Sequence, residues 1–154
     1  FQGYFVFLVT YWAVHDIPIS ILATSMIQIP ALLTTMMLMS AYPITQVYQH
    51  KEDRERGDFT LSLSLGILGT FHFTAFAFVM TTLGYAGYFY YYQNLQILLL
   101  YLTLMIPILI YYLSWYQEVR KNIDLADFEN TMKLNRLSAF CLNTFFLLLI
   151  IFNA

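Results

Sequence analysis

The sequence predicts an all-α protein, a polytopic bundle of about five transmembrane helices. Of its 154 residues, 60% are hydrophobic and only 10% are charged, whereas a soluble domain usually carries about 25% charged residues. Aromatic residues make up 19% of the chain, and tyrosine is common where membrane helices meet the headgroups. The apolar runs do not alternate every second residue, as the strands of a membrane barrel do. We therefore expect one transmembrane domain over residues 1–154, set in a lipid bilayer, and the net charge of −2 argues against a nucleic-acid partner.

Five apolar stretches divide the chain, at about residues 1–14, 18–50, 59–92, 94–117 and 136–153. The last four are long enough for a helix to cross about 30 Å of hydrocarbon, which takes about 20 residues. The first stretch is short and starts with Phe1 instead of Met, so we expect it to end a helix whose start lies in a missing N-terminal portion. In the second stretch, Pro18 suits the first turn of a helix. Pro30 and Pro43 lie further inside it, where we expect each to produce a kink.

The positive charges test this division. All seven Lys and Arg lie in two connections: Lys51, Arg54 and Arg56 follow the second stretch, and Arg120, Lys121, Lys133 and Arg136 follow the fourth. The connections HDIP and YYYQN carry none. Cytoplasmic loops of membrane proteins are enriched in Lys and Arg. We therefore expect an integral protein of a bacterial inner membrane, with residues 51–58 and 120–136 in the cytoplasm and the two short connections outside.

Small residues recur at three- and four-residue steps along the third stretch: Ser62, Gly66, Thr70, Thr74, Ala77, Thr81 and Gly84. On one straight helix they share a face, and such faces favour close packing of transmembrane helices. His72 lies in the same stretch and is a candidate functional residue. A haem would need a second histidine, but His15 and His50 are predicted at opposite ends of the membrane, so a hydrogen-bonded interior His72 is favoured. The single cysteine, Cys141, is predicted to be a packed side chain.

The charged segment 51–58 follows the second stretch directly. A solvated loop would explain its charge and Gly57, but not what precedes it. On a continuing helix, Gln46, Gln49 and Asp53 share a face at its end. A carboxylate beside amide oxygens suits magnesium, which works through one or two carboxylates and substrate phosphates. The basic neighbours that could neutralise a phosphate are Lys51, Arg54 and Arg56.

This segment, YPITQVYQHKEDRERGDFTLSLSLG, resembles the second polar motif of the UbiA superfamily, the intramembrane aromatic prenyltransferases. The residues that match are Asp53, Gly57, Thr60 and Leu61. The segment FENTMKLNRLSAFCLNTFF also resembles the start of the last helix in some bacterial members. The resemblance implies a nine-helix fold, of which this chain would supply the fifth to ninth helices, with the first motif in the missing part. The chain departs from many members by having Gln46 and Gln49 where they have Asp.

The resemblance implies a function as well. The cofactor would be Mg²⁺, held by Asp53, Gln49 and Gln46, and the diphosphate of an isoprenyl donor would lie on Lys51, Arg54 and Arg56. The reaction would be transfer of the isoprenyl group to an aromatic or lipid acceptor, as in quinone biosynthesis, provided that the full-length chain has the first Asp-rich motif.

Two other functions remain open. A catalytically degenerate relative could serve as a structural subunit of a larger membrane complex of the respiratory type, and Gln46 and Gln49 favour that alternative. A transporter fits less well, because the acidic residues are predicted at the membrane ends and transporter sites usually lie near the midplane.

Overall fold

The computed structural model describes residues 2–15 and 17–153, and the described residues are helical with no strand. The elements are α1 (Gln2–His15), α2 (Ile19–Leu22), α3 (Ser25–Ala41), the 3₁₀ helix η1 (Pro43–Gln49), α4 (His50–Arg56), α5 (Leu61–Tyr92), α6 (Leu95–Lys121), the 3₁₀ helix η2 (Ile123–Leu125) and α7 (Phe128–Asn153). Within the described ranges, four helical stretches are long and apolar enough to cross a membrane: Ser25–Arg56, Leu61–Tyr92, Leu95–Lys121 and Phe128–Ile151. The prediction of an all-α transmembrane bundle is confirmed. Four helices of this length and composition indicate a membrane protein.

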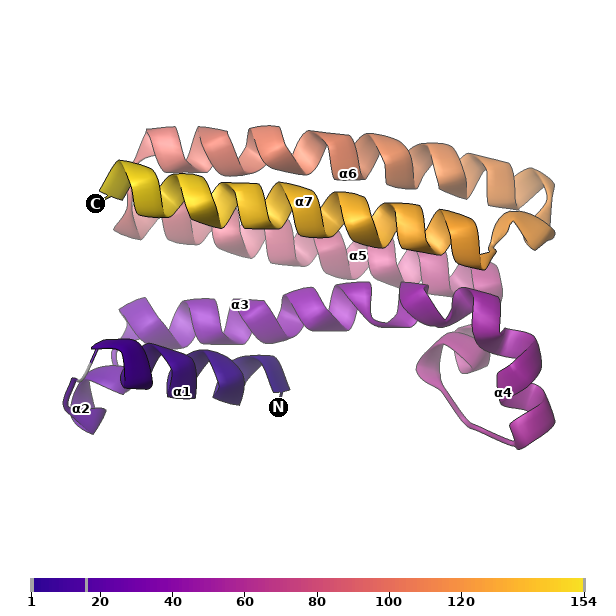
Figure 1. Cartoon of the computed structure of the whole chain (residues 1–154), viewed down its shortest axis with the longest axis horizontal. Coiled ribbons are helices and arrows are strands. Elements are labelled where there is room, and N and C mark those ends of the chain that lie inside the picture. Colours follow the sequence, from indigo (N-terminus) through magenta and orange to yellow (C-terminus); the bar gives the residue numbers. More distant parts are fainter. Residues whose placement is uncertain (1, 16, 154) are drawn as a thin grey trace.

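The long helices lie side by side along the longest axis of the molecule (Figure 1). Helix α4 and the α6–α7 connection lie at one end, and α2 and the α5–α6 connection lie at the other. We call the first of these the charged end, made by residues 50–58 and 120–133. Both basic connections therefore lie at the same end, as the alternation of the helices requires. That this end faces the cytoplasm stays a prediction, and Asp16 of the HDIP connection lies outside the described residues.

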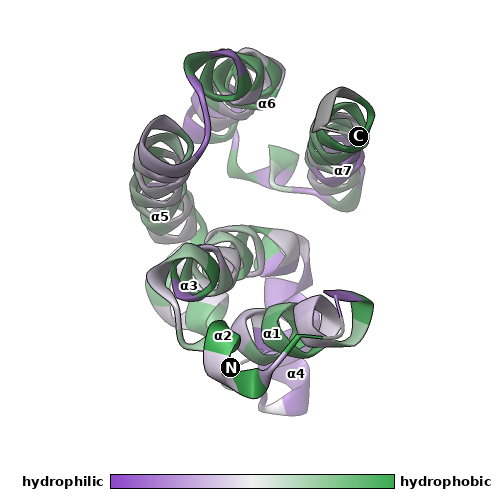
Figure 2. Ribbon diagram, turned by 90° about the vertical axis from the view of Figure 1, so that its left-hand side faces the viewer, coloured by the Kyte–Doolittle hydropathy of each residue, from purple (hydrophilic) through white to green (hydrophobic). Residues whose placement is uncertain are grey.

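Seen end-on, α3, α5, α6 and α7 are arranged around a common centre (Figure 2). Helix α5 packs against α3 on one side and α6 on the other, α7 packs against α6 and η1, and α1 packs on α3. Buried aromatic side chains join α5 and α6, with the ring centroids of Phe71 and Trp115 4.8 Å apart. Further from the charged end, Phe145 of α7 packs on Phe89 and Tyr101. These contacts hold α5, α6 and α7 together around the interior of the bundle.

The second stretch is more broken than predicted. It starts with the separate short helix α2, and α3 begins only after Thr24. Pro30 lies within α3, which continues past it to Ala41. At Pro43 the chain changes to the 3₁₀ helix η1, because proline has no N–H to donate to the preceding turn. The kink predicted at Pro43 is therefore a change of helix type.

The stripe of small residues packs as predicted along most of α5. Thr70, Thr74 and Thr81 are buried, and a Cβ at Gly84 would collide with the side chain of Leu33 on α3. This close approach is the arrangement that small residues permit between membrane helices.

The prediction of one straight helix is wrong at Gly66. Its φ of 70° and ψ of 172° are not helical, so α5 consists of two helical segments that meet at a kink. The Thr70 hydroxyl donates to the Gly66 carbonyl oxygen at 2.7 Å, as threonine hydroxyls often do four residues along a helix. The kink brings the Ser62 hydroxyl to 3.1 Å from that of Thr70, eight residues away. A Cβ at Gly66 would meet no other atom within 4 Å, so this glycine is required by its backbone conformation and not by close packing.

Three further predictions concern Cys141, His72 and the start of the last helix. Cys141 is buried at 3% exposure and free, which confirms a packed side chain. His72 is hydrogen-bonded as predicted, 2.6 Å from the Tyr116 hydroxyl, but it is exposed, so the interior position was wrong. The last helix begins at Phe128, not Arg136, because Asp127 accepts a hydrogen bond from the Asn130 backbone N–H and starts the helix earlier.

Candidate functional site

An open groove of about 590 Å³ lies at the charged end, between α4 and the start of α7. Of the predicted phosphate-binding residues, Lys51 and Arg54 line it, and His50 lies beside them. Acidic side chains contribute as well, namely Glu55 from α4 and Asp124 and Asp127 from the opposite wall. Both carboxylate oxygens of Asp127 already accept hydrogen bonds from Asn130. The groove is therefore lined by ionic groups of both signs, with its two cations on the α4 wall.

His50 connects this wall to α5. It is buried, and its Nε2 lies 2.8 Å from the hydroxyl oxygen of Ser62. Ser62 is in turn within hydrogen-bond distance of Thr70. A short chain of buried polar side chains, His50, Ser62 and Thr70, therefore joins α4 to α5, and it positions Lys51 directly after His50 and Arg54 one turn further along α4.

Asp53, the principal predicted metal ligand, is buried at 2% exposure and does not line the groove. Its Oδ1 accepts a hydrogen bond from Arg56 Nη2 at 2.8 Å, and Arg56 Nε donates to Asp58 Oδ2 at 3.0 Å. The turn that brings Asp58 there ends α4 at Gly57, which has a φ of 74° in the left-handed region, where glycine is favoured. The predicted phosphate ligand Arg56 thus joins two carboxylates around this turn.

The predicted helical face of Gln46, Gln49 and Asp53 is interrupted, because the glutamines belong to η1 and Asp53 belongs to α4. Both glutamines are half-buried, and Gln49 Nε2 donates to the Tyr48 hydroxyl at 2.7 Å. Oδ2 of Asp53 is buried and has no hydrogen-bond partner among the described residues.

These residues fit magnesium only in part. A free carboxylate oxygen and amide oxygens are suitable donors, but the one carboxylate is neutralised by Arg56. In the part of the chain that the structure describes, no group of three His, Cys, Asp or Glu side chains could hold a metal ion. Magnesium ligation by Asp53, Gln49 and Gln46 stays a prediction.

A second hollow, of about 220 Å³, lies among α3, η1, α5, α6 and α7. Its walls are mainly apolar, with Met37, Phe78 and Met105 among the lining residues, and Thr74 contributes a hydroxyl group. A cavity of about 150 Å³ lined by apolar side chains binds benzene. This cavity is therefore large enough for an aromatic ring or a short branched hydrocarbon chain.

The groove and the cavity adjoin along the same two elements. On η1, Ile44 lines the cavity and Tyr48 lines the groove; on α7, Thr131 lines the cavity and Phe128 lines the groove. The rings of Tyr48 and Phe128 pack edge to face with centroids 5.2 Å apart. An ionic pocket and an apolar pocket thus lie on successive turns of one pair of helices.

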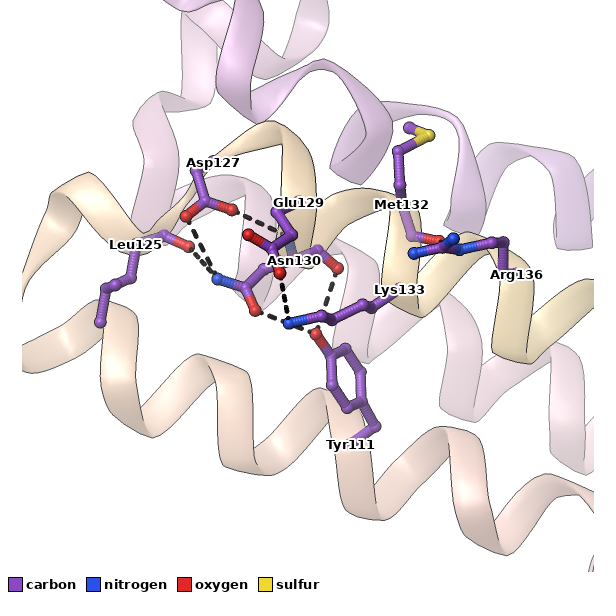
Figure 3. Close-up of polar contacts among 8 residues, drawn as sticks. All are labelled: Tyr111, Leu125, Asp127, Glu129, Asn130, Met132, Lys133 and Arg136. Carbon is purple, nitrogen blue, oxygen red and sulfur yellow. Dashed lines mark hydrogen bonds and ion pairs between the residues drawn. The ribbon is translucent and has the colours of Figure 1, made fainter.

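Sequence reasoning did not find the polar cluster that holds α7 against α6 (Figure 3). The Tyr111 hydroxyl donates to the side-chain oxygen of Asn130 at 3.1 Å, and Asn130 Nδ2 donates to the Leu125 carbonyl oxygen. Trp115 donates to the same carbonyl oxygen at 2.7 Å. An Asp followed three residues later by a polar residue is a typical helix start, so Asp127 and Asn130 carried a signal that could have been read.

A scan against models of known protein families gave no match, and neither did searches of curated proteins and of solved structures. Function therefore has to be inferred from the side chains of the groove and the cavity.

Proposed function

We propose that this chain forms part of an integral-membrane protein that binds an isoprenyl diphosphate, and that the protein is a UbiA-like prenyltransferase acting on an aromatic or lipid acceptor. One observation supports this most: the groove that contains Lys51 and Arg54 adjoins an apolar cavity along η1 and α7. A ligand with an anionic head and a hydrocarbon tail matches that order of surfaces. A purely apolar ligand would not need the two cations.

Lys51 and Arg54 would act on the diphosphate. In prenyl transfer the bond between the allylic carbon and the diphosphate oxygen breaks, and the electron pair leaves with the diphosphate. Fixed cations beside the departing oxygens stabilise the charge that develops there. The allylic centre becomes electron-poor, the acceptor attacks it, and the proton displaced from the acceptor passes to solvent or base. Lys51 and Arg54 can neutralise the charge of the diphosphate whether or not Asp53 binds a metal ion.

The alternative is a structural subunit of a larger membrane complex, without catalysis. The observation that favours it is the state of Asp53, which is paired with Arg56 and buried away from the groove. A carboxylate held in this way stabilises the α4 turn whether or not a substrate binds. Binding and turnover therefore have to be measured separately.

Binding tests the first part of the proposal. The protein in lipid nanodiscs would be titrated with geranyl diphosphate, and K51E/R54E compared with the control K133E/R136E, which makes the same charge change on α7, outside the groove. We expect at least about tenfold weaker binding for K51E/R54E alone, since a hydrogen bond to a charged group contributes about 1.5–3 kcal/mol. Equal losses in the two double variants, or no binding by the wild type, would overturn the proposal.

Turnover decides between enzyme and structural subunit. Transfer of a radiolabelled isoprenyl group to an aromatic acceptor would be measured with magnesium and with a chelator, in the wild type, Asp53→Asn and Asp58→Asn. Both acids form ion pairs with Arg56, so a role limited to holding the turn would affect the two variants alike. Loss of transfer in Asp53→Asn alone would show that Asp53 takes a direct part in transfer. Binding without any transfer by the full-length wild type would support the structural subunit.

A further inference from the structure

Three side chains form a polar cluster on the outer surface of α5 and α6, away from the groove. His72 Nε2 of α5 lies 2.6 Å from the hydroxyl of Tyr116 on α6. One turn further along α6, the guanidinium carbon of Arg120 lies 5.9 Å from the centre of the Tyr116 ring, a distance typical of a cation–π contact. His72 and Arg120 are exposed and Tyr116 is half-buried. The ring of Tyr116 thus connects an exposed imidazole with an exposed guanidinium.

The surface next to this cluster is apolar. His72, Phe76 and Leu83 lie four and seven residues apart, so they share one face of α5, and all are exposed. An exposed apolar face on a helix long enough to span a bilayer is suited to hydrocarbon chains. His72 is therefore the polar residue at the charged end of a lipid-facing strip.

The cluster lies near the charged end of the long helices. Helix α6 ends at Lys121, and at 1.5 Å per residue Tyr116 lies only about 7.5 Å from that end. Arg120 and Lys121 are exposed in the last turn. Among the described residues, neither of them takes part in any of the ion pairs, which join Arg56 to Asp53 and Asp58, and Lys133 to Glu129. Two cations without an acidic partner therefore lie directly beside an apolar strip.

We propose that the cluster of His72, Tyr116 and Arg120 binds the headgroup of an anionic phospholipid. The lipid phosphate would lie on the Arg120 guanidinium, with Lys121 adding charge, and the acyl chains would run along Phe76 and Leu83. The hydrogen bond between His72 and the Tyr116 hydroxyl holds the Tyr116 ring under Arg120, so His72 acts by positioning. The whole chain has a net charge of −2, so general attraction of the protein to an anionic membrane does not account for such binding. A soluble phosphate would make no use of the adjoining apolar strip.

The test uses the chain in nanodiscs of phosphatidylcholine with a minor fraction of spin-labelled phosphatidylglycerol, and it measures the fraction of label immobilised by the protein. Arg120→Gln should weaken the apparent affinity about fivefold, because a basic side chain near anionic lipid contributes about 1 kcal/mol. Tyr116→Phe keeps the ring but loses the hydrogen bond to His72, and it should weaken binding less. The control Arg136→Gln removes the same charge from an exposed position on α7 and should bind like the wild type. Thermal unfolding in pure phosphatidylcholine checks that each variant is folded.

Three results would overturn the proposal. Equal weakening by Arg120→Gln and Arg136→Gln would show that only overall charge matters. Full displacement of the labelled lipid by inorganic phosphate would assign the cluster to a soluble anion. Dimers that disappear in Arg120→Gln, with no change in lipid immobilisation, would assign the surface to a second copy of the chain.

Discussion

Gly66 is the position where a small substitution should have the largest effect relative to its size. With φ 70° and ψ 172°, it adopts a conformation that is essentially restricted to glycine, and holding another residue there costs about 1–3 kcal/mol. An added Cβ meets no atom within 4 Å, so the whole cost of Gly66→Ala is backbone strain. If the backbone relaxes instead, the hydrogen bonding between Thr70 and Ser62, which lie eight residues apart across the kink, is lost, at about 0.5–1.5 kcal/mol per bond.

The matched control is Gly87→Ala. Gly87 lies in the same helix, is exposed, and has open space around it, but its φ is not in the positive region. Alanine in a helix is about 0.8–1 kcal/mol more favourable than glycine. Two chemically identical substitutions in one helix should therefore change the free energy of unfolding in opposite directions, with a gap of about 2–4 kcal/mol between them.

Cys141 provides the assay. It is the single cysteine of the chain, it lies on α7, and it is 3% exposed, so its labelling by a maleimide reports opening of the bundle and not of α5 alone. In mild detergent, where opening is in equilibrium, Gly66→Ala should label about five- to 150-fold faster than the wild type. Gly87→Ala should label more slowly than the wild type. Equal labelling rates of the two variants would refute the assignment of strain to Gly66.

The remaining predictions use the same labelling rate. Gly84→Val should destabilise the bundle by about 1–3 kcal/mol, because a side chain at position 84 displaces Leu33 from the α3–α5 contact; a rate equal to that of the wild type would show that α3 and α5 separate easily. Asp127→Ala should cost about 0.5–2 kcal/mol through loss of the cap on α7. Tyr111→Phe should cost about 0.5–1.5 kcal/mol through its hydrogen bonds to Asn130. The double variant should lose less than the sum, since both residues hold Asn130, and strict additivity would contradict the shared cluster.

Much of the fold could be predicted because it depends on properties that are local in the sequence. An apolar run of about 20 residues forms a helix in lipid whatever its neighbours are, since the backbone polar groups must be satisfied within the segment. The ends of α5 and α6 were therefore close to those expected. The close packing of α5 against α3 at Gly84 was also predictable, because a stripe of small side chains marks a close contact wherever the partner helix is.

The candidate site was less predictable, because its geometry depends on where one helix type changes to another. The face expected for Gln46, Gln49 and Asp53 assumed one continuous α-helix, and the 3₁₀ helix that begins at Pro43 rotates the glutamines relative to Asp53. The position of Arg56 in the sequence suggested that it binds a phosphate. It could not show that Arg56 forms ion pairs with two nearby carboxylates.

The sequence by itself determined that this protein is a bundle of membrane-spanning helices with its basic connections at one end, since composition and length are enough to decide which segments enter lipid. Only the tertiary structure decided that Asp53 is buried against Arg56, that Lys51 and Arg54 instead line the groove, and that this groove adjoins an apolar cavity along η1 and α7. The physical reason is that burial, and the choice of side chains that line a groove, depend on contacts between segments distant in the chain, even though the ion pair between Arg56 and Asp53 joins residues only three positions apart. The kink at Gly66, and the hydrogen bond between His50 and Ser62 that follows from it, set those contacts at the charged end.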